Sequence, residues 1–121
     1  MARSDFVGQL RTLGYEVTVH ADDRVSFPYV IPVGKFADQA ITLGFVIPQD
    51  FNLHPPSGPH VRPKLLSTNP VAGTHPNCGI HDNSPFGSEW QYWSRPLNHW
   101  AQTQRTARDV MAHINHLFDT L

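Results

Sequence analysis

Cys78 is the strongest candidate nucleophile in this sequence, and it lies among small and polar residues rather than on an apolar stripe. A thiolate can accept an acyl group and pass it to an amine, given an amide that supports the oxyanion and an open groove. His81 and Asp82 follow at three and four residues, where they could orient or deprotonate that amine. The residue types therefore allow nucleophilic chemistry at Cys78 that needs no cofactor, although an incidental thiol beside solvated loop residues has the same pattern.

The composition indicates a single soluble domain. The 121 residues, 40% of them hydrophobic, suffice for one globular domain over 1–121. The net charge of −1, spread along the chain, argues against nucleic-acid binding. A single cysteine and the lack of a long apolar run favour a soluble protein of the reducing cytoplasm, with no membrane partner. None of the eight histidines forms a close helical pair of ligands, so we expect no catalytic metal.

The N-terminal half predicts a helix followed by an antiparallel meander. Apolar residues recur at helical spacing after Ser4, a good N-cap, and Gly14 is placed to end that helix. Alternating runs over 15–19, 25–29 and 41–47 predict three strands, the first two joined by a polar turn at Asp22-Asp23. Pro48 closes the third strand because proline cannot donate to a sheet ladder.

The C-terminal half predicts a long irregular segment and a final helix. From Pro48 to about Trp90 the chain is rich in Pro, Gly, Asn, His and Ser, with one short strand expected at Val61 to Leu66. An apolar stripe from Ala107 to Leu121 predicts an amphipathic helix packed on the sheet. The three tryptophans are expected in or near the core, with Ser94 and Arg95 bonding the loop.

Two motifs carry a family resemblance. The stretch 46–56 resembles the strand-ending proline, aromatic residue and paired prolines of ubiquitin-conjugating (UBC-like, E2) proteins, with Asn52 where the family usually has proline. Phe51 would tuck beneath this extended segment. The stretch 90–96 resembles the family's Trp-Ser-Pro element with Arg95 inserted, and also the Trp-x-x-Trp-Ser-Arg signature of a prokaryotic branch, the bacterial E2 family protein E.

The resemblance covers nearly the whole chain and implies an α+β, UBC-like fold. It implies acyl transfer through a thioester at Cys78, which would accept the C-terminus of a ubiquitin-like protein and pass it to an amine. It also implies partners: a ThiF-like activating enzyme (E1), a ubiquitin-like protein, and a JAB-type metal-dependent isopeptidase in the same pathway. Bacterial antiphage defence is a setting that this branch suggests. The later helices of longer members are absent, so partner surfaces built on them cannot be carried over.

The resemblance gives two alignments of the site. His75-Pro76-Asn77 resembles the family's His-Pro-Asn, whose Asn supports the oxyanion, but there the cysteine follows by about eight residues. Counting 22 residues from Pro56 to Cys78 matches the family's interval of about twenty and puts the supporting Asn near Asn69. We prefer the second alignment, with His75 to Asn77 a coincidence or a local variant. The candidate site residues are Cys78, Asn69, Asn77, His75, His81 and Asp82.

Two other functions stay open. The displaced His-Pro-Asn and the longer interval between Cys78 and Trp93 also suit an inactive UBC-like module that binds a ubiquitin-like protein or an activating enzyme. A hydroxyl nucleophile, Ser84 or Ser88 in the lengthened loop, would form an oxyester instead.

Overall fold

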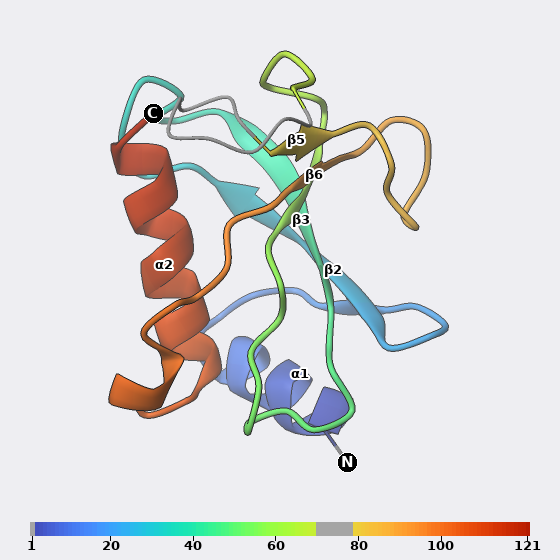
Figure 1. Ribbon diagram of the computed structural model, residues 1–121, viewed down its shortest axis with the longest axis vertical. Helices are drawn as coiled ribbons and strands as arrows, with labels where there is room; N and C mark the ends of the chain where they lie inside the picture. Colours follow the sequence, from blue (N-terminus) through green and yellow to red (C-terminus); the bar gives the residue numbers. More distant parts are fainter. Residues whose placement is uncertain (1, 70–78) are drawn as a thin grey trace.

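The chain folds as an antiparallel sheet with two helices on one face (Figure 1). The computed structural model describes residues 2–69 and 79–121. The elements run α1 (Ala2–Thr12), β1 (Thr18–Val19), β2 (Arg24–Val30), β3 (Ala40–Val46), β4 (His60–Arg62), β5 (Ile80–His81), β6 (Gln91–Trp93), a 3-10 turn (Trp100–Gln102) and α2 (Ala107–Asp119). In this part of the chain the six strands are ordered β1-β2-β3-β4-β6-β5.

Helix α1 starts earlier than expected. It begins at Ala2, so the prediction of Ser4 as N-cap is wrong: Ser4 lies inside the first turn, because the strong helix former Ala2 allows the helix to extend backwards. Gly14 ends it in the left-handed region, with φ of 100°. Phe6 and Leu10 are fully buried, whereas Leu13 follows the helix and is 37% exposed.

The predicted meander is confirmed in its order and antiparallel pairing, but of the first strand expected over 15–19 only Thr18–Val19 pairs. Asp22 and Asp23 both have positive φ, 58° and 61°, and the Arg24 N–H donates to the Ala21 carbonyl, which is the geometry of a type I′ hairpin turn. Strands β2 and β3 pair over their whole length, from Arg24 opposite Val46 to Val30 opposite Ala40.

The irregular segment contributes more strand than expected. The strand predicted from Val61 to Leu66 spans only His60–Arg62, because Pro63 has no N–H to continue the ladder. The sequence did not predict β5 or β6, which have two and three residues and therefore show no periodicity. Strand β6 lies between β4 and β5, and an isolated bridge joins Asn69 to Ile80.

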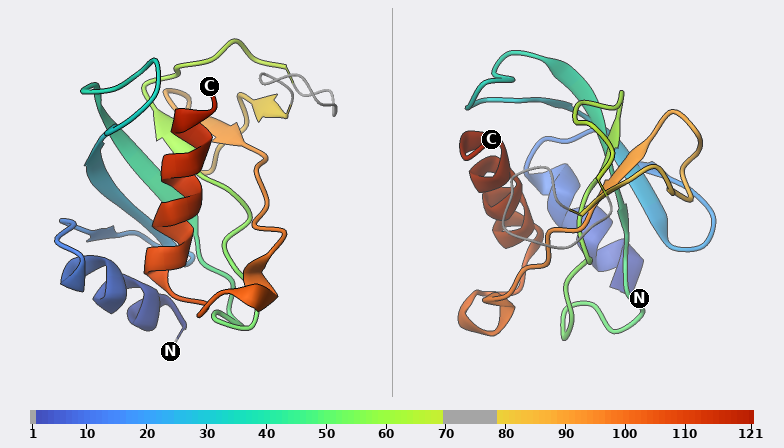
Figure 2. Two further views of the ribbon diagram at one scale, coloured as in Figure 1. Left: turned by 90° about the vertical axis from the view of Figure 1, so that its left-hand side faces the viewer. Right: turned by 45° about the horizontal axis from the view of Figure 1, so that its top comes forward.

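Helix α2 covers the sheet as predicted, beside α1 on the same face (Figure 2). A capping box between Thr106 and Asp109 starts it. Phe118 packs against Tyr29 and Trp93, with ring centroids 6.1 and 5.4 Å apart. Within the described residues, no helix is both long and apolar enough to cross a membrane.

The three tryptophans and Phe51 lie where packing was expected. Trp93 and Trp100 belong to the core, and Trp90 is 6% exposed. Phe51 lies between Phe6 and Trp100, at centroid distances of 5.2 and 5.9 Å. Phe51 is thus buried in the core. The expected extended path around it is wrong, because the Phe51 N–H donates to the Pro48 carbonyl and the Leu53 N–H to the Asp50 carbonyl, which are turns.

The opposite face of the sheet carries a small second cluster. The register aligns Ser26, Gly44, His60, Tyr92 and His81 across five strands, all on the face away from the helices. The loop from β5 to β6 folds back over this row. This loop follows β5, which begins two residues after Cys78 in the sequence.

Candidate functional site

The six candidate residues divide into two groups. Asn69, His81 and Asp82 lie within the described residues, at the bridge to β5, in β5 and directly after it. Cys78, Asn77 and His75 lie outside the described residues. The surroundings of the nucleophile are therefore built from its described neighbours in the chain, beginning at Gly79.

Gly79 connects the segment after Cys78 to the tryptophan motif. Its carbonyl accepts a hydrogen bond from the Ser94 N–H at 2.9 Å. Its φ of 75° favours glycine, and a Cβ at this position would lie 3.2 Å from Nη1 of Arg95. The expectation that Ser94 and Arg95 bond the loop agrees with this geometry.

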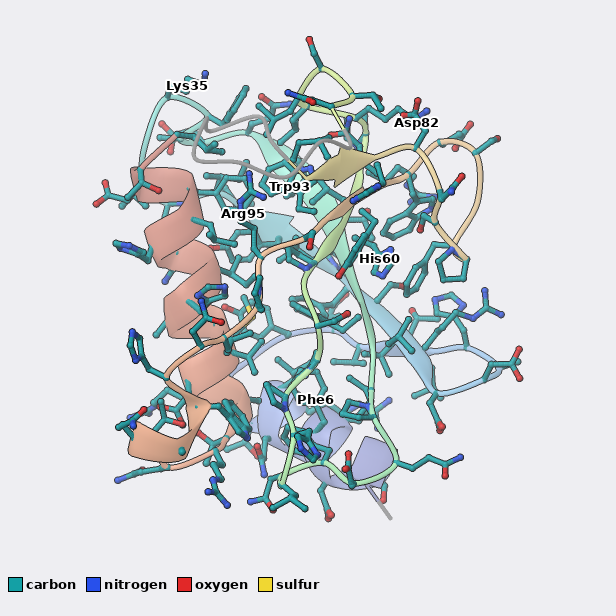
Figure 3. All side chains as sticks on the ribbon, in the orientation of Figure 1. Phe6, Lys35, His60, Asp82, Trp93 and Arg95 are labelled. Carbon is teal, nitrogen blue, oxygen red and sulfur yellow. The ribbon has the colours of Figure 1, made fainter. Side chains whose placement is uncertain are left out.

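Arg95 is held at this place through its side chain and through its backbone. Its Nη1 donates to the Ser94 carbonyl at 2.9 Å, and its own carbonyl accepts from Nε2 of His113 in α2 at 2.9 Å. Burial, the larger influence, lowers the pKa of His113, partly offset by this hydrogen bond. In Figure 3, Arg95 lies toward the start of β5, and Asp82 lies beyond its end. A fixed cation next to Gly79 is suited to favouring a thiolate or an oxyanion.

Asn69 is joined to β5 by its backbone. Its N–H donates to the Ile80 carbonyl and its carbonyl accepts from the Ile80 N–H, both at 2.9 Å. The residue preferred as oxyanion support thus pairs with a residue two positions after Cys78 in the sequence. This is the closest relation that the described residues give between an asparagine and the nucleophile's segment.

Asp82 is an ionised carboxylate with two partners. Oδ1 accepts a hydrogen bond from the Thr68 hydroxyl at 2.7 Å and lies 3.1 Å from Nζ of Lys64. These two groups, Thr68 first, hold the pKa of Asp82 below its usual value. A carboxylate with a lowered pKa is a poor proton acceptor near neutral pH, so the geometry favours orienting an amine over deprotonating it.

His81 faces the outer side of the sheet. Its ring stacks on Tyr92, its cross-strand neighbour, with centroids 5.8 Å apart. This contact fixes the ring plane, and the structure gives His81 a packing role on that face.

The lengthened loop is anchored on the outer face by Ser84 and Phe86. The Ser84 hydroxyl lies 2.9 Å from Nδ1 of His60 and accepts from the Phe86 N–H at 3.2 Å. Burial lowers the pKa of His60 to about 4, so its ring is neutral near pH 7. These bonds tie Ser84 to the sheet, and Ser88 is exposed.

Phe86 fits because residue 44 is glycine. The ring packs against His60 at 4.9 Å and Trp90 at 4.7 Å, and a Cβ on Gly44 would come within 2.8 Å of it. Arg24 donates to the Pro85 carbonyl and lies over the same ring. The sequence analysis did not predict this contact between Phe86 and Gly44. A glycine inside a strand, such as Gly44 in the run 41–45, often marks a place where another group packs closely against the backbone.

The sequence also missed the buried amide of Gln91. Its Oε1 accepts from the backbone N–H groups of Leu65 and Leu66 and from the Trp93 indole, each at 3.1 Å. The side chain is 1% exposed. It fixes the segment before Asn69 against the core, which positions Lys64 and Thr68 beside Asp82.

Metal ligands and hollows were sought among the described residues. Within residues 2–69 and 79–121, no three metal-ligating side chains converge. A hollow of about 750 Å³ lies between α1, Phe51-Asn52 and the start of α2, and another of about 300 Å³ lies beside Trp100. Neither is lined by Gly79 or Asp82.

The comparison with known families agrees with this architecture. The chain matches the family described as Prokaryotic E2 family E over residues 8–120, from α1 through the end of α2. No curated protein and no solved structure matched it. The helix–sheet–helix order, the tryptophan motif joined to Gly79 and this match converge on one conclusion: the chain belongs to the prokaryotic E2 family E, an E2-like family with the UBC-like α+β fold.

Proposed function

We propose that this protein acts as a ubiquitin-conjugating enzyme. In this proposal Cys78 receives the C-terminus of a ubiquitin-like protein from a ThiF-like activating enzyme as a thioester, and passes it to an amine. The chain works as one UBC-like domain, in the cytoplasm, where a lone thiol stays reduced. A JAB-type isopeptidase would reverse the modification, and antiphage defence is the setting that the family suggests.

One observation carries the proposal: Gly79, next to Cys78 in the sequence, is bonded to Ser94 and lies against Arg95. Acyl transfer develops negative charge on sulfur and on the carbonyl oxygen, so a fixed guanidinium beside this segment lowers the barrier. In an unrelated loop with an incidental cysteine, no cation would be needed at this place.

The remaining roles follow from the contacts. Asn69 supports the oxyanion, since its backbone is paired to Ile80. Asn77 and His75 are the alternatives that the other alignment offers. Asp82 orients the incoming amine through the oxygen that holds Lys64, and His81 fixes the strand from which Asp82 emerges.

The test is adduct formation in a purified system. The protein is mixed with the activating enzyme and ubiquitin-like protein encoded beside it, and ATP, and followed by non-reducing gel and intact mass. We expect an adduct that reductant cleaves, lost in Cys78→Ala and converted by Cys78→Ser to a reductant-stable oxyester.

The other outcomes separate the alternatives. A charged activating enzyme without any adduct on this protein would indicate the non-catalytic binding module. An adduct that survives Cys78→Ala but disappears in Ser84→Ala or Ser88→Ala would indicate a hydroxyl nucleophile.

A further inference from the structure

Three histidines line the hollow beside Trp100. This hollow of about 300 Å³ lies between α2 and the segment that precedes it, which is orange in Figure 1. His99 belongs to that segment, whereas His113 and His116 belong to α2. Trp100, 5% exposed, forms part of the wall. Neutral imidazole is the commonest metal ligand in proteins, so the hollow is a candidate site for a metal ion.

The hydrogen bond that His113 makes leaves its other ring nitrogen available. Nε2 lies 2.9 Å from the Arg95 carbonyl oxygen. A carbonyl can only accept, so Nε2 carries the proton and Nδ1 of the neutral ring keeps its lone pair. Histidines that bind a metal through one nitrogen usually donate the other N–H to a carbonyl or a carboxylate, which fixes the ring. His113 already makes this supporting bond.

His113 and His116 are close enough to share an ion. They are three residues apart on α2, a spacing that puts Cβ atoms about 5–6 Å from each other. Burial is the main cause that lowers the pKa of His113; the bond to Arg95 partly offsets it, and the charge of His116 lowers it further. The two rings therefore interact. His113 is neutral near pH 7, so it need not lose a proton before a metal binds.

His99 can supply a third nitrogen from across the hollow. Within residues 2–69 and 79–121 no three metal-ligating side chains converge, so the ion requires His99 and His116 to turn toward His113. Both side chains are exposed, and neither makes a hydrogen bond to a described residue. Exposed side chains change rotamer within nanoseconds, so little opposes this rotation. Asp109 lines the same hollow, but the capping box of α2 already holds its carboxylate.

We propose that His99, His113 and His116 form a binding site for a divalent transition metal ion, with water as the fourth ligand. Three imidazoles and a tetrahedral arrangement suit zinc. The bound ion joins the segment before α2 to the helix. Through His113 it also fixes the carbonyl of Arg95, whose guanidinium lies beside Gly79. The role of the ion is structural, and it does not depend on the proposed function.

Isothermal titration with Zn²⁺, after dialysis against a chelator, tests this site. We expect one ion per chain, bound at least about tenfold more weakly in each of His99→Gln, His113→Gln and His116→Gln. Glutamine at residue 113 can still donate to the Arg95 carbonyl, so a loss of affinity in that variant reports the ring nitrogen rather than the hydrogen bond.

Two control variants and one spectrum locate the ion. His54→Gln is the matched control, because His54 is exposed and pairs with Asp50 one turn before it. His54→Gln and Cys78→Ser should bind Zn²⁺ like the wild type. In long-range ¹H–¹⁵N spectra of the wild type, Zn²⁺ should shift Nδ1 of His113 while Nε2 keeps its proton. Affinity unchanged in any of the three ligand variants, affinity lost in either control, or an unchanged Nδ1 signal would overturn the inference.

Discussion

Substituting Gly44 with alanine should displace the Phe86 ring and loosen the loop between β5 and β6. The added Cβ would lie 2.8 Å from the tip of that ring, well inside contact distance. Because the ring can move outward, Gly44→Ala should lower the free energy of unfolding by no more than the packing energy of that ring. For a half-buried phenylalanine we set that limit at about 2 kcal/mol, below the range for fully buried rings.

A double-mutant cycle isolates this contact. Phe86→Ala alone should also lower the free energy of unfolding by about 2 kcal/mol. In the double variant the alanine at residue 44 enters vacated space, so Gly44→Ala should become neutral or slightly stabilising. The coupling energy should therefore be about 2 kcal/mol.

Urea denaturation of the four proteins, followed by tryptophan fluorescence, measures the cycle. Trp90 packs on Phe86, so its emission also reports displacement of the ring in the folded state. Strictly additive losses, near 4 kcal/mol for the double variant, would show that alanine at residue 44 acts through the strand backbone and would refute the contact argument.

Three further predictions follow from buried or fixed polar groups. Burial lowers the pKa of His60 to about 4, so the unfolded chain binds a proton first on acidification, and the free energy of unfolding should fall by about 3 kcal/mol between pH 6.5 and 4. Denaturant titrations at several pH values should show that the free energy of unfolding changes less with pH in His60→Gln than in the wild type. Gln91→Leu leaves three donors without their acceptor and should cost about 3 kcal/mol or more in urea, whereas the exposed Gln102→Leu should cost almost nothing. Arg95→Gln should slow alkylation of Cys78 by iodoacetamide at pH 7 more than Arg95→Lys does, because a nearby cation favours the reactive thiolate. Equal rates in the two variants would show that the charge at residue 95 has no effect on the reactivity of the thiol.

The parts of the fold that repeat a period were predictable from sequence. Strands β2 and β3 and helix α2 each present several alternating or helically spaced apolar residues, and all three were found where expected. The turn at Asp22-Asp23 was predictable because aspartate tolerates positive φ. Strands β5 and β6 are too short to show a period, and long-range pairing alone creates them.

The candidate site was predictable only as a set of residue types. Cys78, His81 and Asp82 were chosen by chemistry and spacing, but the lysine that pairs with Asp82 lies 18 positions earlier and no local pattern joins them. The same holds for Gln91, a polar residue that the sequence gives no reason to bury. Its burial depends on three donors that meet only in the folded chain.

The contacts of Ser84 and Phe86 on the outer face also divide the loop between β5 and β6 into an anchored part and an exposed tip. Ser84, Phe86 and Trp90 contact the sheet or one another, whereas Gly87, Ser88 and Glu89 are exposed. A peptide inserted between Ser88 and Glu89 would extend into solvent while both of its ends stay tethered. This position therefore suits the insertion of an epitope or a fluorophore-bearing tag, which would label the protein in a cell without altering either helix.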